Sequence, residues 1–254
     1  MAFLEIRNLC RSFGGLRAVG DVSFGVEQGA IKAVIGPNGA GKTTLFNLIA
    51  GHLRPESGDV LFEERSIYGF APHRIAERGI LRTFQNIKLF SHMTVLDNVL
   101  VGLHTRGSAG FLKSMVQWPA MLGEEEKNGE RASEMLEFFG LTDVAATEVS
   151  QLPFGRQRAV EFARALAPAP KLLLLDEPAA GLNIQETRAL AKQIRKVHDT
   201  GTTLLIVEHD MSLIMDISDE IVVLSYGEKI AEGKPSEIQR NPEVIRVYLG
   251  EGDA

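Results

Sequence analysis

The spacing of apolar residues changes along the chain and divides it into three stretches. Strand-like runs fill most of the first 85 residues, a helical period follows from about 86 to 159, and strands then alternate with helices. The expected strands are 3–8, 21–26, 31–35, 60–62, 80–84, 172–175, 203–207 and 221–224, with a hairpin-like segment ending near residue 232. This order predicts an α/β fold interrupted by a helical subdomain.

Helical spacing, proline and glycine mark the remaining elements. The expected helices are one from about residue 41, one from 72 to 79, then 94–103, 111–122, one through 139, one through 167, 185–198, one from 210, 235–239 and 242–249. The charged run Glu124–Gly129 predicts a break between two of them, with its three glutamates as a solvated helix start. No internal repeat is present.

The strand Ile31–Ile35 runs into a glycine-rich turn and then a helix. The turn consists of Gly36, Pro37, Asn38, Gly39, Ala40, Gly41, Lys42, Thr43 and Thr44. It fits the pattern G-x-x-x-x-G-K-[ST] in the strand–turn–helix context that the pattern requires. Glycines let backbone N–H groups face an anion, and the helix adds the positive end of its dipole. We therefore predict a nucleoside triphosphate site in which Lys42 contacts the β- and γ-phosphates and Thr43 binds Mg²⁺.

Three further positions carry candidate chemistry at the ends of strands. The four-leucine run Leu172–Leu175 is typical of a strand buried on both faces, and it delivers Asp176 and Glu177 to the edge where open α/β sheets bind ligands. Asp176 is predicted to hold Mg²⁺ through water and Glu177 to polarise the water that attacks the γ-phosphate. His209 also follows an apolar strand, and it is either a structural histidine or a hydrogen-bond partner of the γ-phosphate.

An aromatic residue near the start of the chain is a candidate for the base of the nucleotide. Phe13 stands beside Gly14 and Gly15. It is either an exposed ring on which adenine stacks or a small core contact near a turn.

This ordered set of residues resembles the ATP-binding cassette of ABC transporters over essentially the whole chain. The segment that separates cassettes from other P-loop proteins is Leu152–Arg158, which precedes a helix leading into the Asp176 strand. The resemblance implies one P-loop ABC domain, residues 1–254, with an N-terminal antiparallel β part. Its core would comprise residues 1–85 and 160–254, its helical signature subdomain 86–159, and its C-terminal helices about 235–254.

The resemblance also implies roles for individual positions. Phe13 looks like the adenine-stacking aromatic, His209 like the switch histidine, and Gln85 like the glutamine that senses Mg²⁺ and γ-phosphate and links them to the membrane partner. The signature loop would consist of Leu152, Pro153, Phe154, Gly155 and Arg156, and would bind the γ-phosphate of ATP held by the opposite subunit. Two ATP molecules would then close a head-to-tail dimer, with 180–183 as the loop that crosses between subunits.

Two positions depart from the family pattern. Pro153 stands where the broad family has serine, and it offers a phosphate neither a hydroxyl nor an N–H group. Arg156 or Arg158 would then supply charge, and a cassette with one weak composite site is an alternative. Asn183 replaces the usual aspartate and removes a carboxylate near the dimer seam.

Three features point to one branch of the family. The run Pro178–Asn183, the long helical insert with Trp118 and the ending 241–251 are similar to the ATPases of branched-chain amino acid importers. The ending is also similar to the ATPases of lipopolysaccharide export and urea uptake. The resemblance implies ATP and Mg²⁺ as ligands, two integral-membrane permeases, a second ABC ATPase in a homo- or heterodimer, and indirectly an external solute-binding protein.

Composition narrows the remaining alternatives. The net charge of −6 gives no broad nucleic-acid footprint, so no nucleic-acid partner is expected. Cys10 is the single cysteine, which excludes an intrachain disulfide. No signal peptide or membrane-spanning run is found, so we expect a soluble protein, peripheral at the cytoplasmic face of the inner membrane.

Two other functions compete with a transport ATPase. One is a soluble ABC protein that acts in DNA repair or translation, and the other is a P-loop kinase. The kinase leaves residues 152–158 and His209 without a role.

Overall fold

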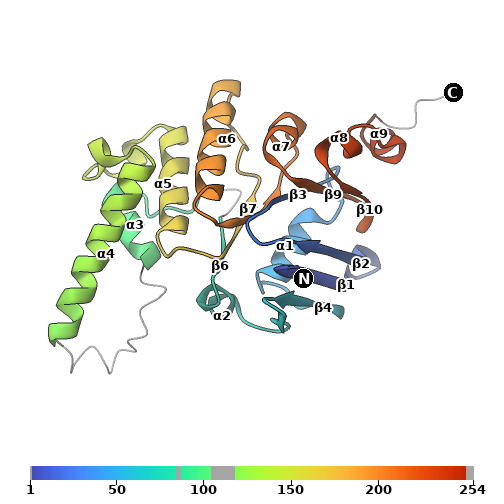
Figure 1. Ribbon diagram of the computed structural model, residues 1–254, viewed down its shortest axis with the longest axis horizontal. Coiled ribbons are helices and arrows are strands. Elements are labelled where there is room, and N and C mark those ends of the chain that lie inside the picture. Colours follow the sequence, from blue (N-terminus) through green and yellow to red (C-terminus); the bar gives the residue numbers. More distant parts are fainter. Residues whose placement is uncertain (1, 84–86, 104–117, 250–254) are drawn as a thin grey trace. The chain divides into compact units, whose positions relative to one another are not determined.

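The computed structural model describes residues 2–83, 87–103 and 118–249 (Figure 1). The chain forms two compact units. The core unit consists of Met1–Gln85 and Lys171–Ala254, and the helical unit of Asn86–Pro170. Within the described residues, none of the helices has the length and apolar character needed to cross a membrane.

A mixed sheet forms the centre of the core unit. Its strand order is β10-β9-β3-β8-β7-β6, with all neighbours parallel except the β9–β10 pair. The strands are β3 (Ile31–Ile35), β6 (Ile80–Arg82), β7 (Leu172–Asp176), β8 (Thr203–Val207), β9 (Glu220–Ser225) and β10 (Glu228–Gly233). Every residue of β3, β7 and β8 is buried, as expected for strands covered on both faces.

The register of this sheet brings the ends of three strands together. Val207 of β8 pairs with Val34 of β3 on one side and with Asp176 of β7 on the other. Because these strands are parallel, the residues that follow them emerge at the same edge. That edge receives the glycine-rich turn after β3, Glu177 after β7 and His209 after β8.

A smaller antiparallel sheet accompanies the central one, as the family resemblance implies. Its order is β2-β1-β4-β5. Its strands are β1 (Leu4–Phe13), β2 (Leu16–Val26), β4 (Ser57–Phe62) and β5 (Arg65–Ser66), so the first two are longer than the apolar pattern indicates. The extra length comes from the β1–β2 hairpin, in which Phe13 pairs with Leu16 around Gly14 and Gly15.

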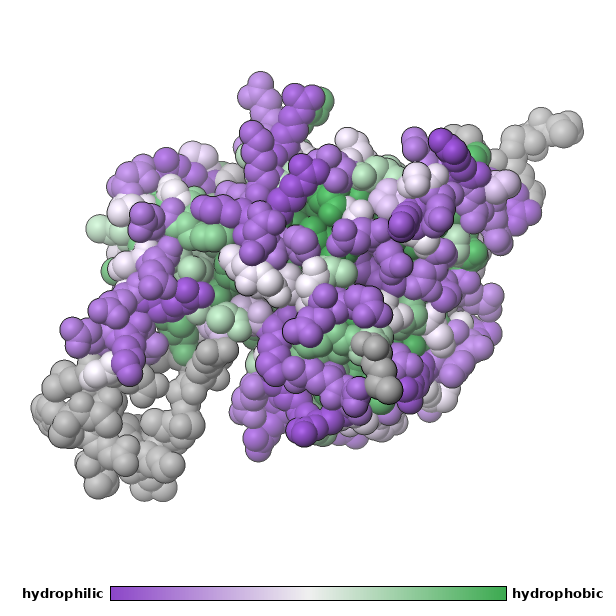
Figure 2. All heavy atoms as spheres, in the orientation of Figure 1, coloured by the Kyte–Doolittle hydropathy of each residue, from purple (hydrophilic) through white to green (hydrophobic). Residues whose placement is uncertain are grey.

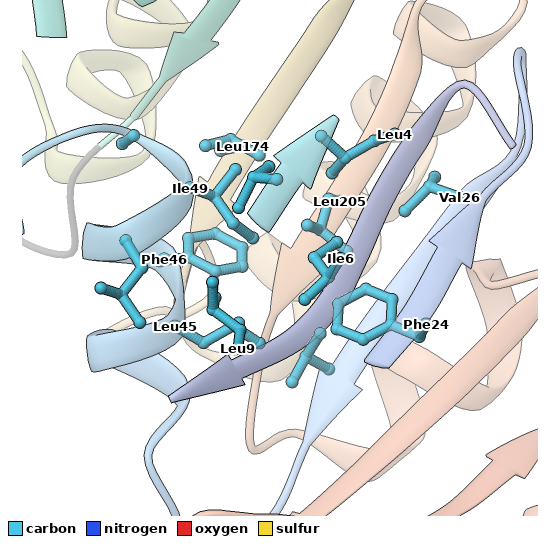
Figure 3. Close-up of a cluster of buried hydrophobic side chains, with 14 of the residues drawn as sticks. Leu4, Ile6, Leu9, Phe24, Val26, Leu45, Phe46, Ile49, Leu174 and Leu205 are labelled. Carbon is cyan, nitrogen blue, oxygen red and sulfur yellow. The ribbon is translucent and has the colours of Figure 1, made fainter. Parts of the chain in front are cut away.

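The helix after the glycine-rich turn, α1 (Lys42–Ile49), packs between the two sheets. Figure 3 shows its Leu45, Phe46 and Ile49 side chains among residues of β1 and β2 and the strand residues Leu174 and Leu205. These three side chains are fully buried, and each contributes roughly 1.5–3 kcal/mol of burial free energy. The helix that opens at the turn is therefore held by the core on both sides.

The other helices of the core unit flank the central sheet. They are α2 (Pro72–Glu77), α6 (Ile184–His198), α7 (Met211–Ile217), α8 (Pro235–Ile238) and α9 (Pro242–Leu249). Helices α6 and α7 lie on one side of strands β7, β3 and β9, and α1 with the smaller sheet lies on the other (Figure 1). The α/β architecture predicted from the strand and helix pattern is confirmed.

The described residues of the helical unit form three packed helices and two short turns of 3₁₀ helix. They are α3 (Val95–Leu103), α4 (Trp118–Phe138), η2 (Thr142–Val144), η3 (Val149–Gln151) and α5 (Phe154–Leu166), and the three α-helices contact one another. The predicted helix 111–122 starts outside the described residues, so only its end, within α4, is seen.

The predicted break at 124–129 is wrong, because α4 continues through it. Glutamate and lysine are strong helix formers, and a single interior glycine such as Gly129 costs about 1 kcal/mol. Burial of Ala132, Met135 and Leu136 one to two turns later offsets that cost. Figure 2 shows hydrophilic residues along the visible side of α4, and Glu125, Glu126 and Lys127 are exposed, so these charged residues are solvated within a continuous helix.

The boundary between the two units also differs from the expected one at 159/160. That position lies inside α5, which is continuous, and the helical unit extends to Pro170. The physical reason is that the continuous helix α5 packs along α3, so the residues of α5 after 159 belong to the helical unit together with those before it.

Helix α6 begins with a capping box. The Oδ1 atom of Asn183 accepts hydrogen bonds from the N–H groups of Gln185 (2.9 Å) and Glu186 (3.0 Å). The Glu186 carboxylate in turn accepts from the Asn183 N–H at 2.9 Å. Asn183 therefore satisfies N–H groups that the first turn of a helix leaves without intrahelical partners.

We expect the substitution Asn183→Ala to lower the free energy of unfolding by about 1 kcal/mol, because it removes this cap. Asn183→Asp keeps the side-chain acceptor and should unfold like the unsubstituted chain. Urea unfolding followed by circular dichroism measures both. An Asn183→Ala chain as stable as the original would contradict the assigned cap.

Candidate functional site

The glycine-rich turn has a backbone that only glycine permits at two positions. Gly36 (φ 153°) and Gly41 (φ 99°) both have positive φ. A Cβ atom on Gly36 would lie 2.2 Å from the Leu224 carbonyl oxygen, and one on Gly41 would lie 2.2 Å from that of Ala18. The turn is therefore packed against two neighbouring strands, which fixes the direction of its N–H groups.

The Lys42 side chain is folded back into this turn. Its Nζ atom donates to the carbonyl oxygens of Gly36 (2.7 Å) and Pro37 (3.0 Å), and the residue is only 6% exposed. Burial lowers the pKa of Lys42, and the nearby carboxylates of Glu177 and Glu208 act in the opposite direction. The ammonium group can exchange its two carbonyl acceptors for the oxygens of an entering phosphate.

A pocket of about 360 Å³ opens above the turn. It is lined by Phe13, Leu16, Arg17, Ala18, residues 38–44, Glu177 and Tyr226. Phe13 is 44% exposed with the Arg11 guanidinium 5.0 Å from its ring, so the alternative of a core contact is wrong. Leu16 and Tyr226 are also exposed, which gives the pocket an apolar wall beside the glycine-rich turn.

Asp176 lies in a buried ion pair at the end of β7. Its Oδ2 atom accepts from Arg82 Nη2 at 2.6 Å, and the same guanidinium donates from Nη1 to Asn47 Oδ1 of α1 at 2.7 Å. Both partners of the ion pair have side chains less than a tenth exposed. The Asp176 carboxylate and the Thr43 hydroxyl are hard oxygen donors of the type that Mg²⁺ binds together with phosphate oxygens. These residues fit the ion, with Arg82 orienting the carboxylate.

Glu177 has a strained backbone, with φ 45°. Its N–H donates to the Val207 carbonyl at 2.8 Å, which holds the start of the loop on β8, and its side chain lines the pocket. His209, whose side chain is 58% exposed, has Nδ1 3.9 Å from Glu177 Oε2. The structure thus brings the predicted glutamate and histidine together at the edge that also carries Lys42.

The predicted signature segment belongs to the helical unit. Pro153 is the N-cap of α5, and its carbonyl accepts from the N–H groups of Arg156 (2.9 Å) and Gln157 (3.0 Å). Arg156 pairs with Asp143 at 2.8 Å and is partly exposed. Arg158, in contrast, is buried and bonded to Glu161 at 2.7 Å, so the idea that it adds charge at the loop is wrong.

Gln85, expected to sense Mg²⁺ and γ-phosphate, lies outside the described residues.

Two charged residues of this edge were missed by the sequence reasoning. The largely buried Arg82 side chain bonds to the predicted site residue Asp176. The fully buried Glu208 bonds to the loop that follows Glu177 and to the loop of His209. A signal for Glu208 was available, because it follows a buried strand just as Asp176 closes one. Arg82 gives a weaker signal, as one basic residue at the end of a short strand.

The last described helix also reaches the glycine-rich turn. Burial raises the pKa of Tyr248, in α9, to about 12, although a hydrogen bond with the Gly36 backbone acts to lower it. Residues of α9 and of the turn line a common pocket with the β9–β10 hairpin. The C-terminal helix therefore packs on the core next to the first residue of the turn.

Comparison with known proteins decides the family. Residues 19–180 match the family described as ABC transporter, and residues 228–254 match that of branched-chain amino acid ATP-binding cassette transporters. The chain belongs to the ABC transporter family. As an ATP-binding cassette it binds nucleotide and hydrolyses ATP, so the alternative of a P-loop kinase is excluded.

Individual relatives cover nearly the whole of this ABC ATPase. It is 43% identical over 251 residues to the high-affinity branched-chain amino acid transport ATP-binding protein BraF of Pseudomonas aeruginosa, covering 98% of each chain. It is 41% identical over 249 residues to LivG of Escherichia coli K12, again covering 98% of each chain. The ADP conformation of MJ1267, an ATP-binding cassette of an ABC transporter, superposes with a TM-score of 0.87 at 32% identity, covering 99% of this chain and 100% of that one.

We expect Lys42→Ala to weaken ATP and ADP binding by about a hundredfold, because charge-assisted hydrogen bonds to phosphate contribute about 1.5–3 kcal/mol. Lys171→Ala, which removes an exposed lysine paired with Glu63, is the matched control and should bind normally. Isothermal titration calorimetry with ADP measures both. Normal affinity in the Lys42→Ala chain would contradict the assigned phosphate site.

Proposed function

We propose that this chain is the ATP-hydrolysing subunit of an importer of branched-chain or similar amino acids, peripheral at the cytoplasmic face of the membrane. The observation that carries the proposal is the 43% identity to BraF over 98% of both chains. The match of the C-terminal segment to branched-chain amino acid cassettes supports the same solute class independently.

The proposed division of labour at the site follows from the geometry of its edge. Lys42 and the N–H groups of the turn hold the β- and γ-phosphates, and Phe13 stacks on adenine. Glu177 orients and polarises the attacking water, and His209 donates to the γ-phosphate. The proximity of Glu177 and His209, both at the edge that carries Lys42, supports assigning them to one reaction.

The proposed metal ligands are the Thr43 hydroxyl, the Asp176 carboxylate through water, and Gln85. When bound, Mg²⁺ neutralises charge on the phosphates of ATP. Asp176 is held ready by its ion pair with Arg82.

A second cassette completes each site in this proposal. The N-terminus of α5, with Leu152, Pro153, Phe154, Gly155 and Arg156, contributes N–H groups and helix dipole to the γ-phosphate held by the other subunit. Pro153 lacks an N–H, so Gly155 and the partly exposed Arg156 carry more of the interaction. Two different cassettes, two permeases and an external solute-binding protein form the assembly that we propose.

We expect Glu177→Gln to lower the turnover number by about a hundredfold or more, the range for loss of a general base. ATP affinity should stay within about twofold, since the phosphate-binding groups are unchanged. In size-exclusion chromatography with ATP, the variant should elute as a trapped dimer. The control is Glu63→Gln, which makes the same chemical change at an exposed carboxylate that does not line the pocket. Undiminished phosphate release from the Glu177→Gln chain would reject the assigned role.

We expect tagged protein, affinity-purified from detergent-solubilised membranes, to carry two polytopic permeases and a second cassette. Mass spectrometry identifies the co-purifying chains. Uptake of labelled leucine, lost when the gene is deleted and restored by the intact chain, then tests the solute. If the co-purifying permeases export lipopolysaccharide or import urea, and leucine uptake is unaffected, the proposed solute class is rejected. Recovery only in the soluble fraction would instead indicate a soluble, non-transport ABC ATPase.

A further inference from the structure

Glu208 is a buried acid that none of the roles assigned above uses. It follows the last residue of β8, and its own N–H contacts the Val34 carbonyl of β3 at 3.4 Å. The residue is 0% exposed. It stands at the centre of the edge where the glycine-rich turn, the Glu177 loop and the His209 loop emerge.

The carboxylate of Glu208 bonds to two of these loops at once. Its Oε1 atom accepts from the Ala179 N–H at 2.7 Å, in the loop that follows Glu177. Its Oε2 atom accepts from the N–H groups of His209 (2.7 Å) and Asp210 (3.2 Å). Oε2 also lies 3.5 Å from His209 Nδ1.

We propose that Glu208 is a positioning residue that fixes the Glu177 loop and the His209 loop relative to each other; this rests on the function proposed above. A fully buried carboxylate is costly unless it is paired or hydrogen-bonded, and here three N–H groups stabilise it. The arrangement sets the 3.9 Å separation of Glu177 Oε2 and His209 Nδ1.

The chemistry of the contacts explains why this position requires glutamate. Each oxygen serves a different loop, and both must accept. Glutamine has one oxygen and would turn its NH₂ group against an N–H donor. Aspartate keeps the charge but is one methylene shorter, so it can serve its neighbours His209 and Asp210 and loses the bond to Ala179.

The strained backbone of Glu177 explains why the hydrogen bond between Glu208 and the Ala179 N–H matters. A non-glycine residue with φ 45° is retained only where its surroundings hold it. The Glu177 N–H bond to Val207 holds the loop on one side, and the Ala179 bond to Glu208 holds it two residues later.

The test compares Glu208→Gln and Glu208→Asp with a matched control, Asp219→Asn. Asp219 also accepts a backbone N–H, that of Ile31 at 2.7 Å, but at the opposite edge of the same sheet. Because misplacement by about 1 Å costs about a hundredfold, we expect turnover to fall about tenfold to a hundredfold in both Glu208 variants. ADP affinity should stay within about threefold, and Asp219→Asn should match the original chain.

Two further readouts separate positioning from a general loss of structure. Hydrogen exchange of the Ala179 amide should accelerate in Glu208→Asp while the His209 and Asp210 amides stay protected. Adding Glu208→Gln to His209→Ala should slow turnover by a smaller factor than adding it to the original chain, because part of its effect acts through His209 and the rest through the Glu177 loop. If Glu208→Gln does not fold, Glu208→Asp carries the test.

Normal turnover in Glu208→Asp, or full additivity with His209→Ala, would overturn the inference. The Glu177→Gln chain is measured alongside. If it hydrolyses ATP normally, the proposed function fails; if it is inactive while the Glu208 variants are normal, only the positioning role fails.

Discussion

Parallel pairing of β3, β8 and β7 is the constraint on which the rest of the core unit depends. The register in which Val207 faces both Val34 and Asp176 delivers three loops to one edge. All three strands are buried throughout, so a slip would expose or unpair them and is strongly disfavoured. Helix α1 holds the glycine-rich turn at the same edge, since its apolar face is buried between the two sheets (Figure 3). The proposed phosphate site, the proposed water-activating residue and the proposed coupling of two loops thus all depend on one strand register.

Charged residues inside this edge then set the fine geometry. Arg82 joins Asp176 to Asn47 of α1, and Glu208 joins two loops, so each links elements that are far apart in sequence. Both side chains are almost completely buried. In the protein interior, hydrogen bonds to charged groups are strong and an unpaired charge is costly. The lysine of the turn is likewise held by carbonyls until it meets another acceptor.

What could be predicted from the sequence divides along the same line. The strand–turn–helix around Lys42 and the placement of Glu177 and His209 follow from local patterns, because each is a short motif with a fixed strand context. The ion pair of Arg82 and the contacts of Glu208 could not be predicted, since they join positions 94 and 29 residues apart. Burial of Arg158 and the continuity of α4 were missed for a related reason: packing within the helical unit overrides the local charge pattern.

We propose that this single edge of the sheet both binds ATP and carries out its hydrolysis. The most direct measurement is a crystal structure of the Glu177→Gln chain grown with ATP and Mg²⁺. We expect Lys42 Nζ to contact phosphate oxygens instead of the Gly36 and Pro37 carbonyls, adenine to stack on Phe13, and His209 to lie within hydrogen-bond reach of the γ-phosphate. Nucleotide bound away from the turn, with Lys42 still on those two carbonyls, would contradict this proposal.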